Sequence, residues 1–247
     1  TFGTEEQKIR FNTPVASGEA NGCYGLTEAN AGSDPAGMKT TAVLDGDSWI
    51  INGEKKFITN GNIAKYAVIA AVTDKTKGYK GITQFVLDLE NTEGFSVGKV
   101  EEKLGIRGSG TSELVFQDAR IPKDSILGDP GSGFKQMLTT LDSGRIGIAS
   151  QALGIAKAAL EESVNYSKER VQFGKPISSF QATQFKLADM ATRIDASELL
   201  ILKAAWLETN HLPFEREAAQ AKMFASDTAM DATIEAVQIL GGYGYSS

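Results

Sequence analysis

The stretch Tyr24-Gly25-Leu26-Thr27-Glu28-Ala29-Asn30-Ala31-Gly32-Ser33-Asp34 places hydroxyls, a carboxylate and backbone N–H groups in a loop punctuated by glycine. Gly32 permits close approach to the backbone, and loops of this composition can cradle phosphates and the polar edges of cofactors. Taken alone, the stretch is more typical of a surface loop with a capping Ser-Asp pair. A second segment, Phe57-Ile58-Thr59-Asn60-Gly61, sets an aromatic ring beside another hydroxyl.

Between about residues 22 and 128, short β-branched and aromatic runs alternate with turn residues, which predicts strands. Asp45-Gly46-Asp47 separates two such runs and predicts a hairpin, because Asp-Gly accepts the positive φ of a tight turn. A second turn is predicted at 52–55. Strands are expected at 41–44, 48–51, 56–59, 66–73, 82–89, 95–100 and 113–121. This spacing predicts an antiparallel sandwich or barrel, and it argues against a Rossmann fold because strands and helices do not alternate.

After residue 130 the spacing of apolar residues becomes helical. We predict three long helices, at about 137–166, 179–208 and 214–240, the last with a face of alanines. Gly144, Gly147 and Gly154 fall inside the first helix, where each costs about 1 kcal/mol relative to alanine. We therefore expect another group to approach the helix backbone there. Three helices make only part of a bundle, because bundles usually close with four.

Composition excludes several classes of function. The net charge of −6 and the absence of a basic stripe argue against a nucleic-acid partner. No apolar run approaches the roughly 18 residues of a membrane-spanning helix. Cys23 is the one cysteine and His211 the one histidine, so neither a disulfide within the chain nor a metal site is predicted. The neighbours of His211 are typical of a turn that ends a helix.

Segments 24–34 and 57–61 together resemble the flavin-holding middle domain of the acyl-CoA dehydrogenases. Gln238-Ile239-Leu240-Gly241-Gly242-Tyr243-Gly244 resembles the start of the second signature of that family. The resemblance covers essentially the whole chain. It implies an α+β multidomain protein, with an antiparallel β-sandwich or barrel followed by an incomplete four-helix bundle.

The same resemblance implies three parts. Residues 1–21 would be the tail of an N-terminal helical domain, and Glu5-Glu6-Gln7-Lys8 reads as the interior of a helix. Residues 22–130 would be the β domain that holds flavin and acyl-CoA, and residues 131–247 the C-terminal helical domain. Most of the leading helical domain and the last part of the bundle are expected to lie outside residues 1–247.

The cofactor implied is FAD. Seven residues of the β domain are its implied ligands: Tyr24, Leu26, Thr27, Ser33, Phe57, Ile58 and Thr59. In this interpretation Ser33 reaches the pyrophosphate and also the acyl-CoA. Phe57, where the family often has tryptophan, lies against a flavin face, and the Thr59 hydroxyl bonds to flavin N5. A plain amphipathic strand over residues 56–59 is the alternative for these last residues.

Six residues of the helical region are implied to hold the ADP half of FAD: Arg170, Phe173, Gln181, Gln238, Gly241 and Gly242. By resemblance Arg170, Phe173 and Gln181 reach across a subunit interface to the FAD of a neighbouring copy. Arginine suits a pyrophosphate because its planar fork donates two parallel charge-assisted hydrogen bonds. A solvated arginine in a loop, and a helix C-cap at Gly241, are the alternatives.

Asp142 and Arg145 lie three residues apart, on one face of the first helix. By resemblance they bind the CoA part of the substrate, and an intrahelical salt bridge is the alternative. Gly144 stands where relatives acting on isovaleryl and long-chain substrates carry their catalytic Glu. We therefore predict no catalytic base within the chain and expect it in a Tyr-Glu-Gly-like segment beyond Ser247. Four carboxylates match no family base: Glu28, Glu113, Glu162 and Glu235.

The resemblance implies an oxidoreductase of fatty-acid β-oxidation that converts acyl-CoA thioesters to trans-2-enoyl-CoA and passes electrons to an electron-transfer flavoprotein. Residues 141–149 are closest to the short-chain (butyryl-CoA) members. A homotetramer, built as a dimer of dimers, is expected in the bacterial cytoplasm or, alternatively, the mitochondrial matrix. Residues 1–247 alone are expected to be inactive. Two alternatives stay open: an acyl-CoA oxidase or nitroalkane-oxidase relative, and a non-catalytic flavin- or acyl-CoA-binding protein.

Overall fold

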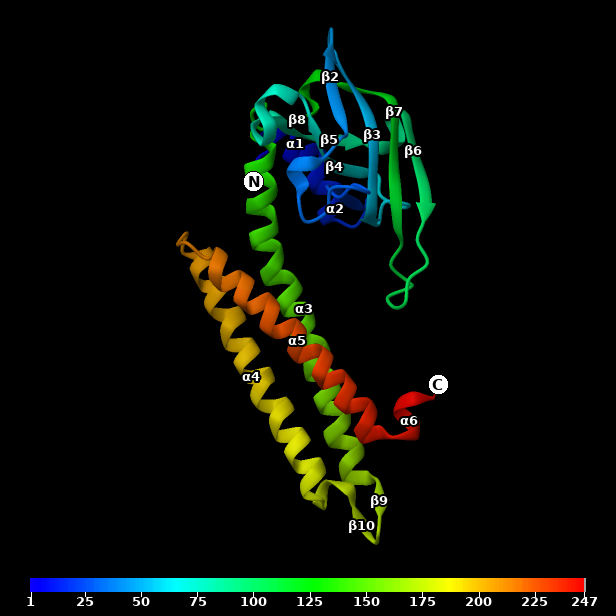
Figure 1. The fold of residues 1–247 in the computed structure, drawn as a ribbon, viewed down its shortest axis with the longest axis vertical. Helices are drawn as coiled ribbons and strands as arrows, with labels where there is room; N and C mark the ends of the chain where they lie inside the picture. The colour runs from blue at the N-terminus through cyan, green and yellow to red at the C-terminus, as the bar shows by residue number, and fades with distance from the viewer. Residues whose placement is uncertain (247) are drawn as a thin grey trace. The chain divides into compact units, whose positions relative to one another are not determined.

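The structure is a computed structural model that describes residues 1–246. It divides into two compact units, Thr1–Leu138 and Thr139–Ser247. Figure 1 shows strands in the first unit and long helices in the second. The division lies within helix α3 (Gly133–Glu169), a little beyond the domain limit predicted at residue 130.

The first unit opens with a short helical segment made of α1 (Glu5–Gln7), the π-helical turn η1 (Lys8–Asn12) and α2 (Thr13–Ala16). The side chains of Thr4 and Gln7 each accept a hydrogen bond from the backbone N–H of the other, at 3.2 and 3.1 Å, which makes a capping box. Glu5 is therefore the first residue of a helix, and the prediction of a helix interior at residues 5–8 is wrong.

Eight strands form one sheet: β1 (Gly22–Gly25), β2 (Thr41–Asp45), β3 (Ser48–Thr59), β4 (Tyr66–Val72), β5 (Ile82–Asp88), β6 (Glu93–Val100), β7 (Thr111–Pro122) and β8 (Ile126–Leu127). Short 3₁₀ turns lie between them: η2 (Pro35–Gly37), η3 (Lys75–Gly81), η4 (Leu89–Asn91) and η5 (Lys123–Ser125). The order along the sheet is β6-β7-β3-β2-β4-β5-β8, and β1 pairs with β4.

One edge of β4 is shared between two partners. Its residues 66–69 pair with β1, whereas Val72 pairs with Thr41 of β2, and both of these pairings are parallel. The sheet is therefore not entirely antiparallel, in contrast to the prediction from the sequence, although its remaining pairings are antiparallel. The pair Thr41–Val72 links the strands β6-β7-β3-β2 to β4-β5-β8, and residues of both groups bury a common core that includes Ile51, Ile69 and Phe116. The β-sheet part of the predicted α+β fold is confirmed.

The turn predicted at residues 52–55 is wrong, because β3 continues through it. The register between β3 and β7 shifts between Ile51 and Gly53, which marks a β-bulge. Gly53 has φ of 145°, and a Cβ at this position would lie 2.5 Å from the Thr40 hydroxyl oxygen. The Asn-Gly pair thus bends a strand where another chain segment comes close.

The second unit contains most of α3 together with α4 (Gln181–Thr209), α5 (Glu215–Leu240) and the short α6 (Gly242–Tyr245). A small hairpin, β9 (Val171–Gln172) and β10 (Lys175–Pro176), and the turn η6 (Ile177–Ser179) connect α3 to α4. All three predicted long helices are confirmed. His211 has φ of 56° and lies in the turn after α4, as predicted.

The core of the helical unit is built on small side chains of α5. Ile146, Leu153 and Ala156 of α3 and Met190, Ile194 and Ile201 of α4 meet them. Five of the predicted alanines on α5 are buried: Ala218, Ala221, Ala225, Ala229 and Ala232. Because alanine side chains are small, this face allows α3 and α4 to pack closely against α5.

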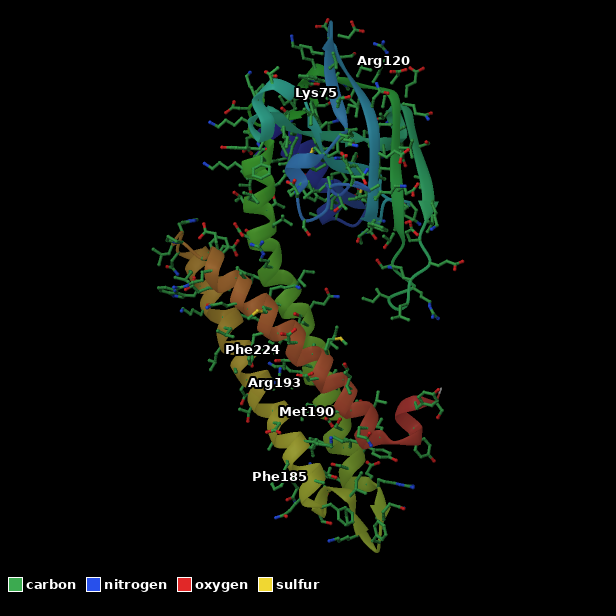
Figure 2. The ribbon with its side chains drawn as sticks, in the orientation of Figure 1. Lys75, Arg120, Phe185, Met190, Arg193 and Phe224 are labelled. Atoms are coloured by element: carbon green, nitrogen blue, oxygen red, sulfur yellow. The ribbon has the colours of Figure 1, made fainter. Side chains whose placement is uncertain are left out.

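Ion pairs join α4 and α5 at the rim of this core. Lys186 pairs with Glu235, and Arg193 pairs with Asp231 at 2.6 Å. Figure 2 labels Arg193 on α4 and Phe224 on α5, and the Arg193 guanidinium lies 5.8 Å from the centre of the Phe224 ring. Because these side chains are partly exposed, each pair should contribute at most about 1 kcal/mol to stability.

The exposed sides of these helices carry large apolar residues: Leu141, Ile148 and Ile155 on α3, Leu199, Leu202 and Trp206 on α4, and Met223, Met230 and Ile234 on α5. Nothing in the chain lies within 4 Å of a Cβ built on Gly144, Gly147 or Gly154, as far as residues 1–246 are concerned. The close approach expected at these glycines is therefore not made by the described part of the chain.

Candidate functional site

The two segments singled out in the β domain meet at a backbone hydrogen bond. The N–H of Lys56 donates to the carbonyl of Thr27 at 2.8 Å. This contact joins the loop that follows β1 to the last third of β3. It brings the hydroxyl-bearing residue Thr27 to the strand that carries Phe57 and Thr59.

Phe57 occupies a bulge in β3. The register with β7 shifts between Lys55 and Ile58, so that both of these side chains are buried although they are three residues apart. Phe57 has φ of 59° and its side chain is 63% exposed. A bulky residue at positive φ is strained, and such strain persists where the surroundings impose it.

The bulge decides which side chains face outward. Over residues 56–59 burial alternates as the amphipathic-strand alternative requires, and the departure from a regular strand is the register shift between Lys55 and Ile58 with Phe57 at positive φ. Thr59 is exposed like Phe57, whereas Ile58 is buried in the core of the sheet. A ligand at this surface would therefore meet the side chains of Phe57 and Thr59 but only the backbone of Ile58.

Tyr24 and Leu26 pack against a small core formed by Ala31, Met38 and Met137, among others. The Gln84 side-chain amide donates to the Tyr24 hydroxyl at 2.6 Å. Burial raises the pKa of Tyr24 to about 12, even though the hydrogen bond works in the other direction. The phenol is therefore engaged within the protein.

The loop beyond Tyr24 ends in an open surface. Ser33 is exposed, and a Cβ built on Gly32 would touch nothing within 4 Å in the described part of the chain. Ser33 and Thr27 thus offer hydroxyls from one loop, as predicted for this segment.

Beneath the loop lies an ion pair that the sequence analysis missed. Lys55 is fully buried and its ammonium donates to the Glu28 carboxylate at 2.7 Å. Burial opposes ionisation of Glu28, yet the Lys55 charge and the N–H of Lys39 hold the pKa of Glu28 below its ordinary value. Burial lowers the pKa of Lys55. No clear signal for this pair was present in the sequence, because a turn was predicted at 52–55 and a lysine in a strand usually faces solvent.

Two of the other carboxylates considered as bases are also engaged. Glu113 pairs with Lys56, and Glu235 pairs with Lys186. With Glu28 buried against Lys55, three of the four carboxylates are held by lysines. Glu162 lies exposed on α3.

A second group of predicted residues gathers in the helical unit. Arg170, Gly241 and Gly242 line one open hollow of about 510 Å³, together with Tyr166, Gln172, Ile177, Ile239, Leu240, Tyr243 and Ser246. Among residues 1–246 the Arg170 guanidinium has no hydrogen-bond or ion-pair partner, and it is exposed. Gly241 has φ of 58° and ψ of −129°, a conformation open to glycine.

The two glycines leave the backbone that lines this hollow uncovered by side chains. A Cβ built on Gly241 or Gly242 would meet no atom within 4 Å in the described residues. Gln238 is exposed one turn earlier on α5, and its carbonyl accepts from the N–H of Gly241 at 3.3 Å. An open glycine backbone, an arginine without a described partner and an amide side chain therefore share one end of the unit.

Phe173 stands at the tip of the β9–β10 hairpin. Phe173 and Gly174 form a two-residue turn with φ of 54° and 75°, the pattern of a type I′ turn. The Phe173 side chain is 93% exposed, and its ring centre lies 6.1 Å from that of Phe180. Gln181, which follows Phe180, is exposed at the first position of α4.

Asp142 and Arg145 form the intrahelical ion pair that was the alternative interpretation. Asp142 is mostly covered, whereas the Arg145 side chain is 40% exposed. Neither residue lines the hollow at Arg170. Gly144, between them, is exposed.

Comparisons with known proteins bear on both units. Residues 23–119 match the acyl-CoA dehydrogenase middle domain, and residues 131–247 match the acyl-CoA dehydrogenase C-terminal domain. The chain belongs to the acyl-CoA dehydrogenase family. A short-chain-specific acyl-CoA dehydrogenase of Clostridium acetobutylicum is 52% identical over 99% of this chain and 64% of its own length.

Two solved structures have the same fold as this chain. Butyryl-CoA dehydrogenase from Megasphaera elsdenii superposes with a TM-score of 0.96 at 53% identity, covering 99% of this chain and 64% of that one. A chain in a structure of the electron transferring flavoprotein of Acidaminococcus fermentans gives a TM-score of 0.97 at 53% identity, with the same coverage. The chain thus spans about two-thirds of the length of these relatives. Among residues 1–246, none of the helices has the length and apolar character to cross a membrane.

Proposed function

We propose that the protein to which these residues belong is an FAD-dependent dehydrogenase that converts short-chain acyl-CoA thioesters to trans-2-enoyl-CoA. The observation that carries this proposal is the contact between the loop at Thr27 and the strand segment with the bulge at Phe57. There, an exposed aromatic ring and two hydroxyl-bearing residues are held together by the Lys56–Thr27 backbone hydrogen bond. The resemblance of both units to short-chain relatives supports it.

The residues present fit FAD. A flavin needs an aromatic or apolar wall and polar groups at its edge, which Phe57, Thr27 and Thr59 offer. Its ADP half carries two phosphates, and the unpaired Arg170 supplies a cation beside the glycine backbone at Gly241 and Gly242, which leaves room for close approach. FAD, when bound, supplies the acceptor for the hydride. FMN would leave Ser33, Arg170, Gln181 and the stretch 238–242 without a purpose.

The chain's own residues would bind and orient the substrate. Ser33 offers a hydroxyl from an open loop, and Asp142 and Arg145 offer a carboxylate and a guanidinium to the CoA portion. Their ion pair on α3 is compatible with this role, because a partly exposed pair contributes little to stability and can be exchanged for contacts to a ligand.

We propose that the general base is none of the four carboxylates considered. Three are held by lysines, and Gly144 carries no side chain that could take a proton. The base is expected in the segment beyond Ser247. Residues 1–247 alone should therefore turn over butyryl-CoA at least about 10²-fold more slowly than the full-length protein, the smaller end of what a general base contributes.

The electron acceptor proposed is an electron-transfer flavoprotein, and the bacterial cytoplasm is the proposed compartment. The match to a chain in a structure of such a flavoprotein supports the first point. The oxidase is the competing function. Stopped-flow reoxidation of the substrate-reduced protein separates them: fast reoxidation by air with peroxide formation would support the oxidase.

We propose a homotetramer, a dimer of dimers. The large apolar residues exposed on α4 and α5 support association, since monomers rarely leave such surfaces uncovered. So does Phe173, whose exposed ring needs a partner. Light scattering of the full-length protein should give four copies, and a monomer that retains FAD would refute the shared site.

The proposed function is tested on the full-length protein by releasing the cofactor with acid and by a series of saturated acyl-CoA substrates. FAD should be recovered, and activity should be greatest at four carbons. Recovery of FMN, or no activity with any acyl-CoA in the presence of an artificial acceptor, would contradict the proposal.

A further inference from the structure

The largest fully buried side chain of the β domain is charged. The Lys55 ammonium donates to Glu28 Oε1 at 2.7 Å and to the Leu26 carbonyl at 3.3 Å. Gly25 makes this possible, because a Cβ there would lie 3.3 Å from Cγ of Lys55 and 3.0 Å from Ile69. The lysine stem thus packs against Gly25 at the start of the loop, and its amine bonds to two residues of that loop, Leu26 and Glu28.

The Glu28 carboxylate closes the loop on itself. Besides Lys55, it accepts hydrogen bonds from the N–H of Lys39 at 2.6 Å and of Thr40 at 3.1 Å. The backbone of Glu28 exchanges two hydrogen bonds with Ala31, at 3.0 and 3.2 Å. One carboxylate therefore ties both ends of the segment 28–40, which carries the exposed Ser33.

Fold stability alone is a poor reason for this arrangement. Burying two charges costs solvation free energy that their attraction rarely exceeds, and apolar residues of similar size often serve a core equally well. What ionic groups add is direction, since each hydrogen bond fixes where a specific backbone atom lies. Here the atoms fixed are Leu26 O and the N–H groups of Lys39 and Thr40.

Resting on the proposed function, we infer that the Glu28–Lys55 pair positions the flavin-binding edge. Lys55 is bonded to Leu26 O, and the next residue, Lys56, donates to Thr27 O at 2.8 Å. The pair thus locks Thr27 against the strand just before the bulge at Phe57. Glu28 and Lys55 are positioning residues: they act on the cofactor through Thr27 and the bulge.

The test uses the full-length protein and the double variant Glu28→Leu, Lys55→Met, in which both charges are replaced by apolar side chains. Three quantities are measured: the midpoint of thermal unfolding, the Kd of FAD, and the visible absorption and circular dichroism of the bound flavin. Ile121→Val is the control, because Ile121 is buried in the same sheet and pairs with Trp49, away from the loop.

The double variant should fold with a midpoint close to wild type, bind FAD about tenfold more weakly and show an altered flavin spectrum, as for a misplaced hydrogen-bonding edge. The control should keep the wild-type Kd and spectrum. An unchanged Kd and spectrum in a folded double variant would overturn the inference and leave the pair a purely structural one.

Glu28→Gln combined with Lys55→Met is the second variant, in case the first double variant does not fold. It keeps the shape of the Glu28 side chain and leaves no unpaired buried charge, and the same weakening of FAD binding and spectral change are expected. If neither variant folds, the pair is required by the fold itself, which contradicts the inference. If the wild-type protein binds no FAD, the proposed function fails instead, so that the two failures are distinguishable.

Discussion

At the scale of single residues, the backbone is strained at two residues of the candidate site. Phe57 and Phe173 both hold an aromatic side chain at positive φ, and both side chains are largely exposed. Each position costs of order 1 kcal/mol in backbone strain. Neither ring gains enough burial within the chain to offset that cost, which supports a role in binding.

The ionised form of Glu28 should make stability depend on acid pH. Its pKa in the folded protein lies below the ordinary 4.5, so its contribution is fully present above about pH 4.5 and is lost as the pH falls through the folded-state pKa. Glu28→Gln should cost about 3 kcal/mol or more at neutral pH, because it leaves Lys55 buried without a counter-charge. Urea unfolding measured between about pH 6 and pH 3 should show this difference shrinking as the pH falls.

Glu162→Gln is the matched control, since Glu162 is exposed on α3. It should be within about 0.5 kcal/mol of wild type at neutral pH. A difference between Glu28→Gln and wild type that stays constant over the whole pH range would contradict the assigned role of the carboxylate.

Arg170 should retain the cofactor. Arg170→Ala removes the unpaired guanidinium from the hollow and should weaken FAD binding roughly 10-fold or more, the range for a charge-assisted hydrogen bond. Lys168→Ala, two residues earlier and also exposed, is the control. Flavin content after gel filtration measures the effect, and equal content in both variants would count against the shared site.

At the scale of elements, irregularities in otherwise regular structure present the predicted residues. The bulge in β3 turns Phe57 outward, and the two-residue turn between β9 and β10 does the same for Phe173. The long helices contribute a different feature, an alanine face that lets them pack closely.

Phe173→Asn should stabilise the hairpin and weaken the site together. Asparagine accepts the positive φ of a type I′ turn, so the free energy of unfolding of the helical unit should rise by a few tenths to about 1 kcal/mol. Loss of the aromatic ring should lower FAD affinity. An unchanged affinity would show that the exposed ring serves no cofactor.

Ala225→Leu should destabilise the helical unit by about 1–3 kcal/mol, because Ala225 is fully buried and a larger side chain overpacks the helix interface. Met223→Leu, on the exposed side of α5, is the matched control and should be nearly neutral. Chemical denaturation followed by circular dichroism measures both. A neutral Ala225→Leu would mean that α5 is loosely packed.

At the scale of the molecule, the predicted site residues fall into two groups, one in each compact unit. Thr27, Ser33, Phe57 and Thr59 belong to the β domain, and Arg170 and Gly241 to the helical unit. Each group by itself lacks part of what a dinucleotide requires. The proposed sharing of FAD between copies is one way in which such halves become a complete site.

The sequence predicted much of this because its signals were local. Helical spacing gave all three long helices, and turn residues gave the Asp45–Asp47 hairpin. The prediction of a turn at Asn52-Gly53 was wrong because the same residues suit a bulge, and only the approach of Thr40 distinguishes the two. The parallel pairing of β4 was not predicted, because pairing between strands distant in sequence leaves no local signal.

In the candidate site, the loop at Thr27 and the glycines at 241–242 were predicted from their resemblance to family motifs, and their roles stay predictions. Motif and spacing could not predict the strain at Phe57, since a backbone angle depends on the register with β7. Nor did they find the Glu28–Lys55 pair, because a lysine in a strand usually faces solvent.

Anaerobic addition of butyryl-CoA to the full-length, FAD-loaded protein tests the central claim most directly. The account predicts that the oxidised flavin absorption is bleached within one turnover and that a trans-2-enoyl-CoA product appears in stoichiometric amount. Flavin that stays oxidised in the presence of saturating butyryl-CoA and longer acyl-CoA substrates would contradict it and would leave a flavin-binding protein without dehydrogenase activity.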